Sequence, residues 1–146
     1  MNGPRRQARE AALQILYFWE VGRTDPADAV EAYFSAHAPE AVGAVRSFAT
    51  MLVEGTISDL AGIDATIARH STNWRLDRLA VVDRLILRLA IWELRHSGGD
   101  VPAAVVINEA VELARRFSTD EAAGFVNGVL DAVRRTDESE TPAARA

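Results

Sequence analysis

The stretch VVDRLILRLAIWEL, residues 81–94, constrains the fold most because it is apolar around almost the whole circumference of a helix. Its apolar residues recur at offsets of three and four, which is the spacing of one helical face. Leu87, Ile91 and Leu94 cover most of the remaining surface. A helix that is apolar on nearly all sides lies in a core. The segment therefore predicts a central helix around which the other elements pack.

Three arginines interrupt this apolar surface. Arg84, Arg88 and Arg95 fall on one narrow stripe of the predicted helix, since offsets of four and seven residues return to the same face. We expect this side of the central helix to reach solvent or a ligand. The recurring charges also exclude a membrane span, which needs about 20 largely uninterrupted apolar residues.

The composition is typical of a single soluble domain. The chain has 146 residues, of which 49% are hydrophobic, enough to bury one core. Its 16 basic and 21 acidic residues give a formal net charge of -5, so any contact with nucleic acid has to be local. It contains neither cysteine nor lysine, which excludes disulfides, thiolate metal sites and lysine chemistry. The first residues lack the apolar core of a signal peptide, and we expect a cytoplasmic protein.

Proline, glycine and capping residues divide the chain into about seven helices. The sequence S-T-D-E at 118–121 has the pattern of a capping box and predicts the start of the last helix. No alternating strand pattern occurs, so the predicted fold class is all-α. The expected helices span residues 4–21, 26–37, 39–54, 57–70, 81–94, 102–117 and 118–135. We expect one domain over residues 1–135, followed by a disordered acidic tail over 136–146.

The sequence offers no catalytic or metal-binding constellation. His37, His70 and His96 lie far apart in the chain, and none has a metal-ligating neighbour at i+4. The GxSxG, GxGxxG and HExxH patterns are missing as well. We therefore expect neither an enzyme nor a bound metal or cofactor.

A basic segment, RRQARE at 5–10, opens the first helix and is followed by Tyr17, Phe18 and Trp19. Each cation at a helix N-terminus opposes the macrodipole by about 0.3 to 1 kcal/mol, so a cluster placed there suggests an anionic partner. Arginine and aromatic side chains together are typical of single-stranded RNA recognition. An exposed basic turn without a role remains an alternative, and Trp19 is better explained as a core residue.

The last helix contains two glycines one turn apart. Gly124 and Gly128 each cost about 1 kcal/mol relative to alanine inside a helix, so we expect at least one to allow close approach of a neighbouring helix. Phe125 lies off the apolar line of this helix. It is either a stacking residue or a buried one.

Three segments resemble the NusB family of transcription antitermination factors. They are RRQAREAALQILYFWE, VDRLILRLAIWEL and VPAAVVINEAVELARRFSTDEAAGFVNGVLDAV. The resemblance covers the first predicted helix and residues 82–133. It implies two packed helical bundles without catalytic activity that bind boxA RNA together with NusE, a small-subunit ribosomal protein. It also implies an indirect association with other Nus factors and RNA polymerase, in support of processive transcription of ribosomal RNA operons.

The resemblance also assigns roles to individual residues. The position of Arg88 corresponds to a basic residue near the RNA path, while the other RNA-contacting positions lie near the two ends of the domain. The implied RNA-binding residues are Arg5, Arg6, Arg9, Arg88, Glu121, Gly124, Phe125 and Asn127. The implied NusE-binding residues are Tyr17 and Asp83.

One position departs from the family pattern. Family members usually carry a basic residue immediately before FVNG, whereas this chain has Gly124. We expect weaker or more partner-dependent RNA binding, with a salt slope shallower by about one unit. Two other readings stay open: a NusB-fold interaction module or homodimer with little intrinsic RNA binding, and an RNA cytosine methyltransferase carrying such a domain. The chain contains no methyltransferase segment, which disfavours the second.

Overall fold

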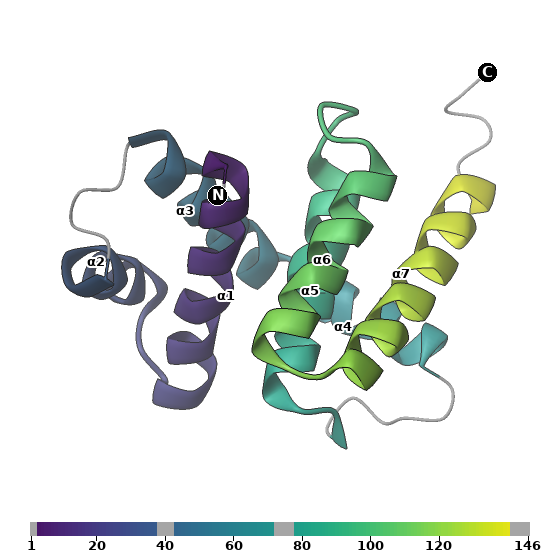
Figure 1. Cartoon of the computed structure of the whole chain (residues 1–146), viewed down its shortest axis with the longest axis horizontal. Helices are drawn as coiled ribbons and strands as arrows, with labels where there is room; N and C mark the ends of the chain where they lie inside the picture. The colour runs from purple at the N-terminus through teal and green to yellow at the C-terminus, as the bar shows by residue number, and fades with distance from the viewer. Residues whose placement is uncertain (1–2, 38–42, 72–77, 141–146) are drawn as a thin grey trace. The chain divides into compact units, whose positions relative to one another are not determined.

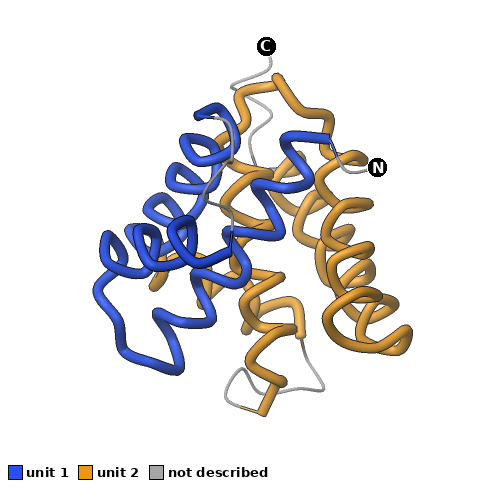
Figure 2. The backbone as a smooth tube through the Cα atoms, turned by 60° about the vertical axis from the view of Figure 1, so that its left-hand side comes forward, with its two compact units in different colours: residues 1–59 blue, residues 60–146 orange. Residues whose placement is uncertain are grey.

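The computed structural model describes residues 3–37, 43–71 and 78–140, and these form seven α-helices and no strand (Figure 1). This confirms the predicted all-α class. The helices are α1 (Pro4–Gly22), α2 (Pro26–His37), α3 (Gly43–Ser58), α4 (Leu60–His70), α5 (Val81–His96), α6 (Ala103–Phe117) and α7 (Asp120–Glu140). They divide into two compact units, residues 1–59 and 60–146, in agreement with the two bundles that the resemblance implies (Figure 2).

Unit 1 is built around the buried face of α1. Ala8, Ala12, Ile15 and Leu16 are fully buried, as their helical spacing predicts, and α1 packs against both α2 and α3. Trp19, which the pattern placed in the core, is only partly buried. The helix ends where Arg23 takes a left-handed conformation with φ of 54°.

Unit 2 is built around α5, which confirms the predicted central helix. Nine consecutive residues, from Leu85 to Glu93, are buried. Helix α5 contacts α4, α6 and α7, so each of its sides meets another helix of the unit. The apolar circumference of the segment is the cause, because only a surrounded helix can bury all of its faces.

The expectation that the arginine stripe on α5 reaches solvent is wrong for Arg88, which is buried, whereas Arg84 and Arg95 are partly exposed. Arg88 is 6% exposed, and its Nε and Nη2 donate to the two carboxylate oxygens of Asp64 on α4 at 2.8 and 2.9 Å. Arg95 donates in the same two-point manner to Asp137 on α7 at 2.9 and 3.1 Å. Aspartates on neighbouring helices compensate the buried Arg88 and the partly exposed Arg95, and the local pattern of α5 contains no information about these partners.

The last helix is longer than predicted. Its expected end at Arg135 is wrong, because α7 continues to Glu140 and residues 136–140 are helical rather than part of a tail. The ion pair of Asp137 with Arg95 and a 3.0 Å hydrogen bond between Thr136 Oγ1 and His70 Nε2 hold these turns to α5 and α4. Residues 141–146 of the expected tail lie outside the described part of the chain.

The third helix also has different bounds. Its predicted end at residue 54 is wrong, because α3 continues through Gly55 to Ser58, and α4 starts at Leu60 rather than at residue 57. Burial of Val53 and Thr56 on the same helix outweighs the roughly 1 kcal/mol cost of an internal glycine. The expected start at residues 39–42 is not among the described residues.

Candidate nucleic-acid interface

The N-terminus of α1 presents positive charge at the positive end of a helix. The N-cap Gly3 provides no side-chain hydrogen bond, and the first turn contains no acidic residue. Arg5 and Arg6 are exposed there, whereas Arg9 is 6% exposed. The macrodipole of a helix favours an anion at its N-terminal end. Of the three predicted arginines, Arg5 and Arg6 therefore offer accessible side chains, and the buried Arg9 does not.

Phe48 on α3 organises this basic turn. The guanidinium carbon of Arg5 lies 4.9 Å from the centroid of the Phe48 ring, and that of Arg9 lies 5.7 Å from it. Both distances are within the range of cation–π interactions, each contributing about 0.5 to 1 kcal/mol at exposed sites. The sequence does not predict this role of Phe48, because no local spacing connects α3 to the start of α1.

The first turns of α7 carry the second predicted RNA-binding segment. The Thr119 hydroxyl accepts a 2.9 Å hydrogen bond from the backbone N–H of Ala122, which caps the helix close to its predicted start. Glu121, Gly124 and Asn127 are exposed. Phe125 is partly buried, so it is neither fully enclosed nor a fully presented stacking surface.

The two glycines of α7 do not serve helix packing. A Cβ added at Gly124 or at Gly128 would meet no other group within 4 Å, and both residues are exposed. The expectation that one of them allows close approach of a helix is therefore wrong. The opposite face of α7 is buried through Val126 and Leu130, and this burial holds the helix together in spite of the glycines.

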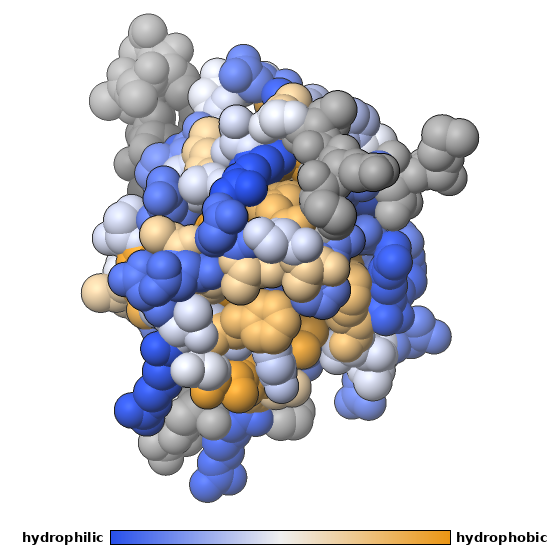
Figure 3. All heavy atoms as spheres, turned by 90° about the vertical axis from the view of Figure 1, so that its left-hand side faces the viewer, coloured by the Kyte–Doolittle hydropathy of each residue, from blue (hydrophilic) through white to orange (hydrophobic). Residues whose placement is uncertain are grey.

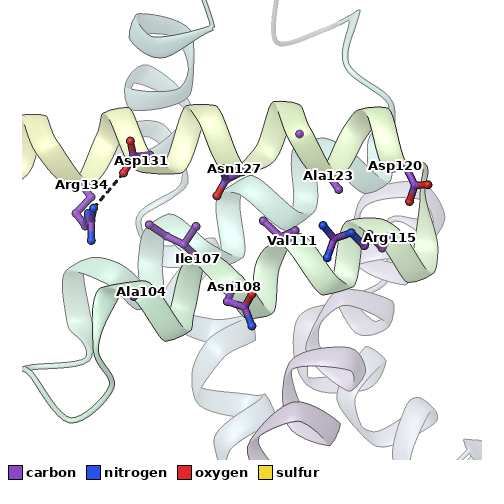
Figure 4. A pocket seen from close by; sticks show the side chains of 11 residues that line it. Ala104, Ile107, Asn108, Val111, Arg115, Asp120, Ala123, Asn127, Asp131 and Arg134 are labelled. Atoms are coloured by element: carbon purple, nitrogen blue, oxygen red, sulfur yellow. Dashed lines mark hydrogen bonds and ion pairs between the residues drawn. The ribbon is translucent and has the colours of Figure 1, made fainter.

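A groove with a volume of about 680 Å³ lies between α6 and α7 (Figure 4). Asn108 of α6 and Asn127 of α7 occupy its middle. Arg115 and Asp120 are near one end, and Asp131 and Arg134 are at the other. Sequence reasoning assigned only Gly124 and Asn127 of this lining. Polar residues recur at helical spacing along α7 between positions 120 and 134, which predicts a polar face on this helix. The local pattern does not predict that this face lines a groove.

The two predicted NusE-binding residues belong to different units. Tyr17 on α1 is 42% exposed, next to Phe18 at 43% and close in sequence to Val21 at 54%. Exposed apolar side chains of this kind interrupt the hydrophilic surface in Figure 3. Asp83 lies in the first turn of α5, where its Oδ1 is shielded from solvent and has no hydrogen-bond partner within the described residues.

Arg88 does not fit the predicted RNA-binding role. Its side chain is enclosed in unit 2 by the ion pair with Asp64, and direct contact with RNA needs an exposed group. We therefore leave Arg88 out of the candidate interface.

The described residues hold no group of three or more histidines, aspartates or glutamates placed to bind a metal ion. The histidines contact protein groups instead: His37 stacks on Tyr33, His96 stacks on Trp92, and His70 bonds to Thr136. No helix in the described ranges is long and apolar enough to cross a bilayer.

Comparison with known proteins agrees with the fold. The sequence model of the NusB family matches residues 6–135. Transcription antitermination protein NusB of Solibacter usitatus (strain Ellin6076) is 46% identical over 142 residues, which cover 97% of this chain and 96% of the relative. A T. maritima NusB structure superposes with a TM-score of 0.83 at 35% identity and covers 92% of this chain and 93% of its own. A structure of antitermination factors NusB and NusE in complex with dsRNA has a TM-score of 0.83 at 27% identity, covering 93% of this chain and 99% of its own.

Proposed function

Because the chain belongs to the NusB family, we propose that it acts as a transcription antitermination factor that binds boxA RNA together with NusE. The observation that carries this proposal is the near full-length match to antitermination proteins. The similar fold found in a complex with NusE and RNA supports it. In this role the protein is non-catalytic, acts in the cytoplasm with other Nus factors on RNA polymerase, and supports processive transcription of ribosomal RNA operons.

The RNA-binding residues that we propose lie in two segments. At the start of α1, the exposed guanidinium groups of Arg5 and Arg6 pair with phosphates, and Arg9 supports them from its buried position beside Phe48. At the start of α7, Glu121, Gly124, Phe125 and Asn127 contact the RNA chain. Tyr17 and Asp83 contact NusE.

RNA binding by this chain alone should be weak. The net charge is -5, and Gly124 stands where the family pattern has a cation. Fewer phosphate contacts mean less counterion release and lower affinity. We expect NusE to raise the affinity by adding phosphate contacts of its own.

Fluorescence anisotropy of a labelled boxA RNA tests this proposal. The titration is made with and without NusE, beside a scrambled RNA of equal length. Selective binding that tightens with NusE is the expected result. Equal affinity with and without NusE would contradict the predicted dependence on the partner.

A paired variant tests the residues. Arg5→Ala with Arg6→Ala should weaken boxA binding and reduce the salt slope by about two units, one for each phosphate contact. The matched control removes two exposed arginines elsewhere, Arg46→Ala with Arg69→Ala on α3 and α4, at the same change in net charge. Circular dichroism checks that both variants keep their helices.

The exposed apolar side chains of α1 favour a second candidate, a protein-interaction module or homodimer with little RNA binding of its own. Tyr17, Phe18 and Val21 offer surface of the kind that protein partners cover. No preference for boxA over the scrambled strand, even with NusE bound, would favour this candidate. Analytical ultracentrifugation of the wild type would then show whether the partner is a second copy of the chain.

A further inference from the structure

The groove between α6 and α7 extends well beyond the α7 segment proposed to bind RNA. Gly124 and Asn127 line its α7 side near one end and in the middle, but the lining continues to Asp131 and Arg134. From Asp120 to Arg134 the helix rises about 21 Å, at about 1.5 Å per residue. The groove is thus a track along the helix rather than a pocket for a compact ligand.

We propose that a single-stranded segment of RNA follows this groove, held by Arg115 and Arg134 through phosphates and by Asn108 and Asn127 through base edges. The inference rests on the proposed function and adds three residues to it: Asn108, Arg115 and Arg134.

The two arginines are available for phosphates. Arg115 has a side-chain exposure of 54% and pairs with Glu112, itself 44% exposed, at 2.6 Å on the same helix. Arg134 is 35% exposed and pairs with Asp131 at 3.1 Å. Such surface pairs within one helix contribute little to stability. A phosphate can therefore replace either carboxylate at small cost and accept two parallel hydrogen bonds from the guanidinium.

The groove also contains two carboxylates, which would repel phosphates. Asp131 lies within 3.1 Å of Arg134 and 3.4 Å of Arg135, so two cations face this one anion. Asp120 is near the Arg115 end of the groove (Figure 4). Carboxylates accept hydrogen bonds, and the ribose 2′-hydroxyl is a donor that DNA lacks. Asp120 and Asp131 thus favour binding of RNA over DNA, whereas the arginines of the groove bind the phosphates of both.

The middle of the groove suits bases. Asn108 and Asn127 are exposed, and each side-chain amide offers a donor and an acceptor, the combination that pairs with adenine edges. Ile107 and Val111 of α6 line the floor of the groove between these polar groups and expose only 7% and 8% of their surface there, so recognition of a base rests on the two amides. Hydrogen bonds to the edges of unstacked bases are one way in which single-stranded RNA is recognised.

The chain provides a matched control for each cation. Arg115 lines the groove, and its neighbour Arg116 does not; Arg134 lines it, and Arg135 does not. Arg115→Ala and Arg116→Ala remove the same charge from the same helix, as do Arg134→Ala and Arg135→Ala. Anisotropy of boxA RNA with the NusE complex, measured at several salt concentrations, compares the members of each pair.

We expect each groove variant to weaken boxA binding about tenfold and to lower the salt slope by about one unit relative to its control. Asn108→Ala should reduce the preference for boxA over scrambled RNA about tenfold and leave the salt slope unchanged. A DNA strand of boxA sequence should bind less tightly than the RNA. Asp120→Ala should reduce the ratio of RNA affinity to DNA affinity.

The results separate this inference from the proposed function. If the wild type prefers boxA with NusE but both groove variants equal their controls, the groove proposal is overturned and the proposed function stands. If the groove variants instead weaken binding of NusE in the absence of RNA, the groove takes protein and the proposal is likewise overturned. If the wild type shows no preference for boxA at all, the proposed function itself fails.

Discussion

Arg88 of α5 and Asp64 of α4 form a two-point ion pair in unit 2, with Nε to Oδ1 at 2.8 Å and Nη2 to Oδ2 at 2.9 Å. The Arg88 side chain is 7% exposed and that of Asp64 24% exposed. The pair therefore contains one cation that is almost fully removed from water. The Asp64 carboxylate offsets the free-energy cost of removing the Arg88 guanidinium from water. Without the carboxylate, that desolvation cost would remain and the attraction of the ion pair would be lost.

Asp64→Ala should lower the free energy of unfolding by on the order of 3 kcal/mol, since it removes the two-point carboxylate acceptor of the buried Arg88 guanidinium. Urea unfolding followed by circular dichroism measures the change. Glu112→Ala is the control, because it removes one partner of an exposed ion pair and should cost less than about 1 kcal/mol. Equal losses in the two variants would show that Arg88 finds water or another acceptor when Asp64 is removed.

Gly128→Ala should raise the free energy of unfolding by about 0.5 to 1 kcal/mol. The residue is helical and exposed, and an added Cβ meets nothing within 4 Å, so only the intrinsic helix preference changes. Thermal unfolding measures the gain. Gly98→Ala makes the contrast, because Gly98 has equally open space but a φ of +63° that an alanine adopts only with strain. If Gly128→Ala lowered the free energy of unfolding and Gly98→Ala raised it, this explanation would be contradicted.

Phe48→Leu should reduce both stability and RNA affinity. The substitution keeps an apolar side chain but removes the ring that faces the guanidinium groups of Arg5 and Arg9, at a cost of about 1 to 2 kcal/mol for two cation–π contacts. Phe48→Trp retains an aromatic face and should restore the RNA affinity. In a double-mutant cycle, the effects of Phe48→Leu and Arg5→Ala on boxA affinity should be less than additive. Strict additivity would mean that the ring does not position Arg5.

The stability of the protein in alkali should depend on Tyr33. Burial raises the pKa of the Tyr33 phenol above its ordinary value of 10.0; the negative charge of Glu10 acts in the same direction, and a hydrogen bond with Gln14 opposes it. The folded state therefore holds this proton more tightly than the unfolded state. The resulting stabilisation is complete below the unfolded pKa and is lost as the pH rises through the folded pKa.

Tyr33→Phe removes this ionisation. Urea unfolding at a series of pH values from about 8 to 12 should show a shallower alkaline loss of stability in the variant than in the wild type. NMR of ring-labelled tyrosine should show the Tyr33 phenol titrating above the value of a free tyrosine peptide. Identical alkaline slopes in the two proteins would contradict the predicted shift.

Local patterns in the chain were sufficient for the seven helices that the described residues form and for the central position of α5. The apolar circumference of residues 81–94 predicts a surrounded helix, and Leu85 to Glu93 are buried as expected. The start of α7 follows from the polar capping sequence around Thr119. Periodicity and capping act over one to three turns, so they can be read without knowing what lies beside the helix.

The residues of the candidate site could be predicted only in part from the sequence. The basic turn with Arg5 and Arg6, and the exposed residues Glu121 and Asn127, follow from the resemblance and lie at the surface. Arg88 has the same charge and helical context as exposed arginines, yet it is buried against Asp64. Nothing in the sequence of α5 distinguishes the two cases, because the deciding partner lies 24 residues away.

Folding decided which charges are exposed and which are paired. Arg95 and Asp137, separated by 42 residues, extend α7 past its expected end, and Phe48 brings α3 against the arginines of α1. The groove between α6 and α7 likewise exists only when two helices lie side by side. Helix formation depends on near neighbours in the chain, whereas ion pairs, cation–π contacts and grooves depend on which distant segments packing brings together.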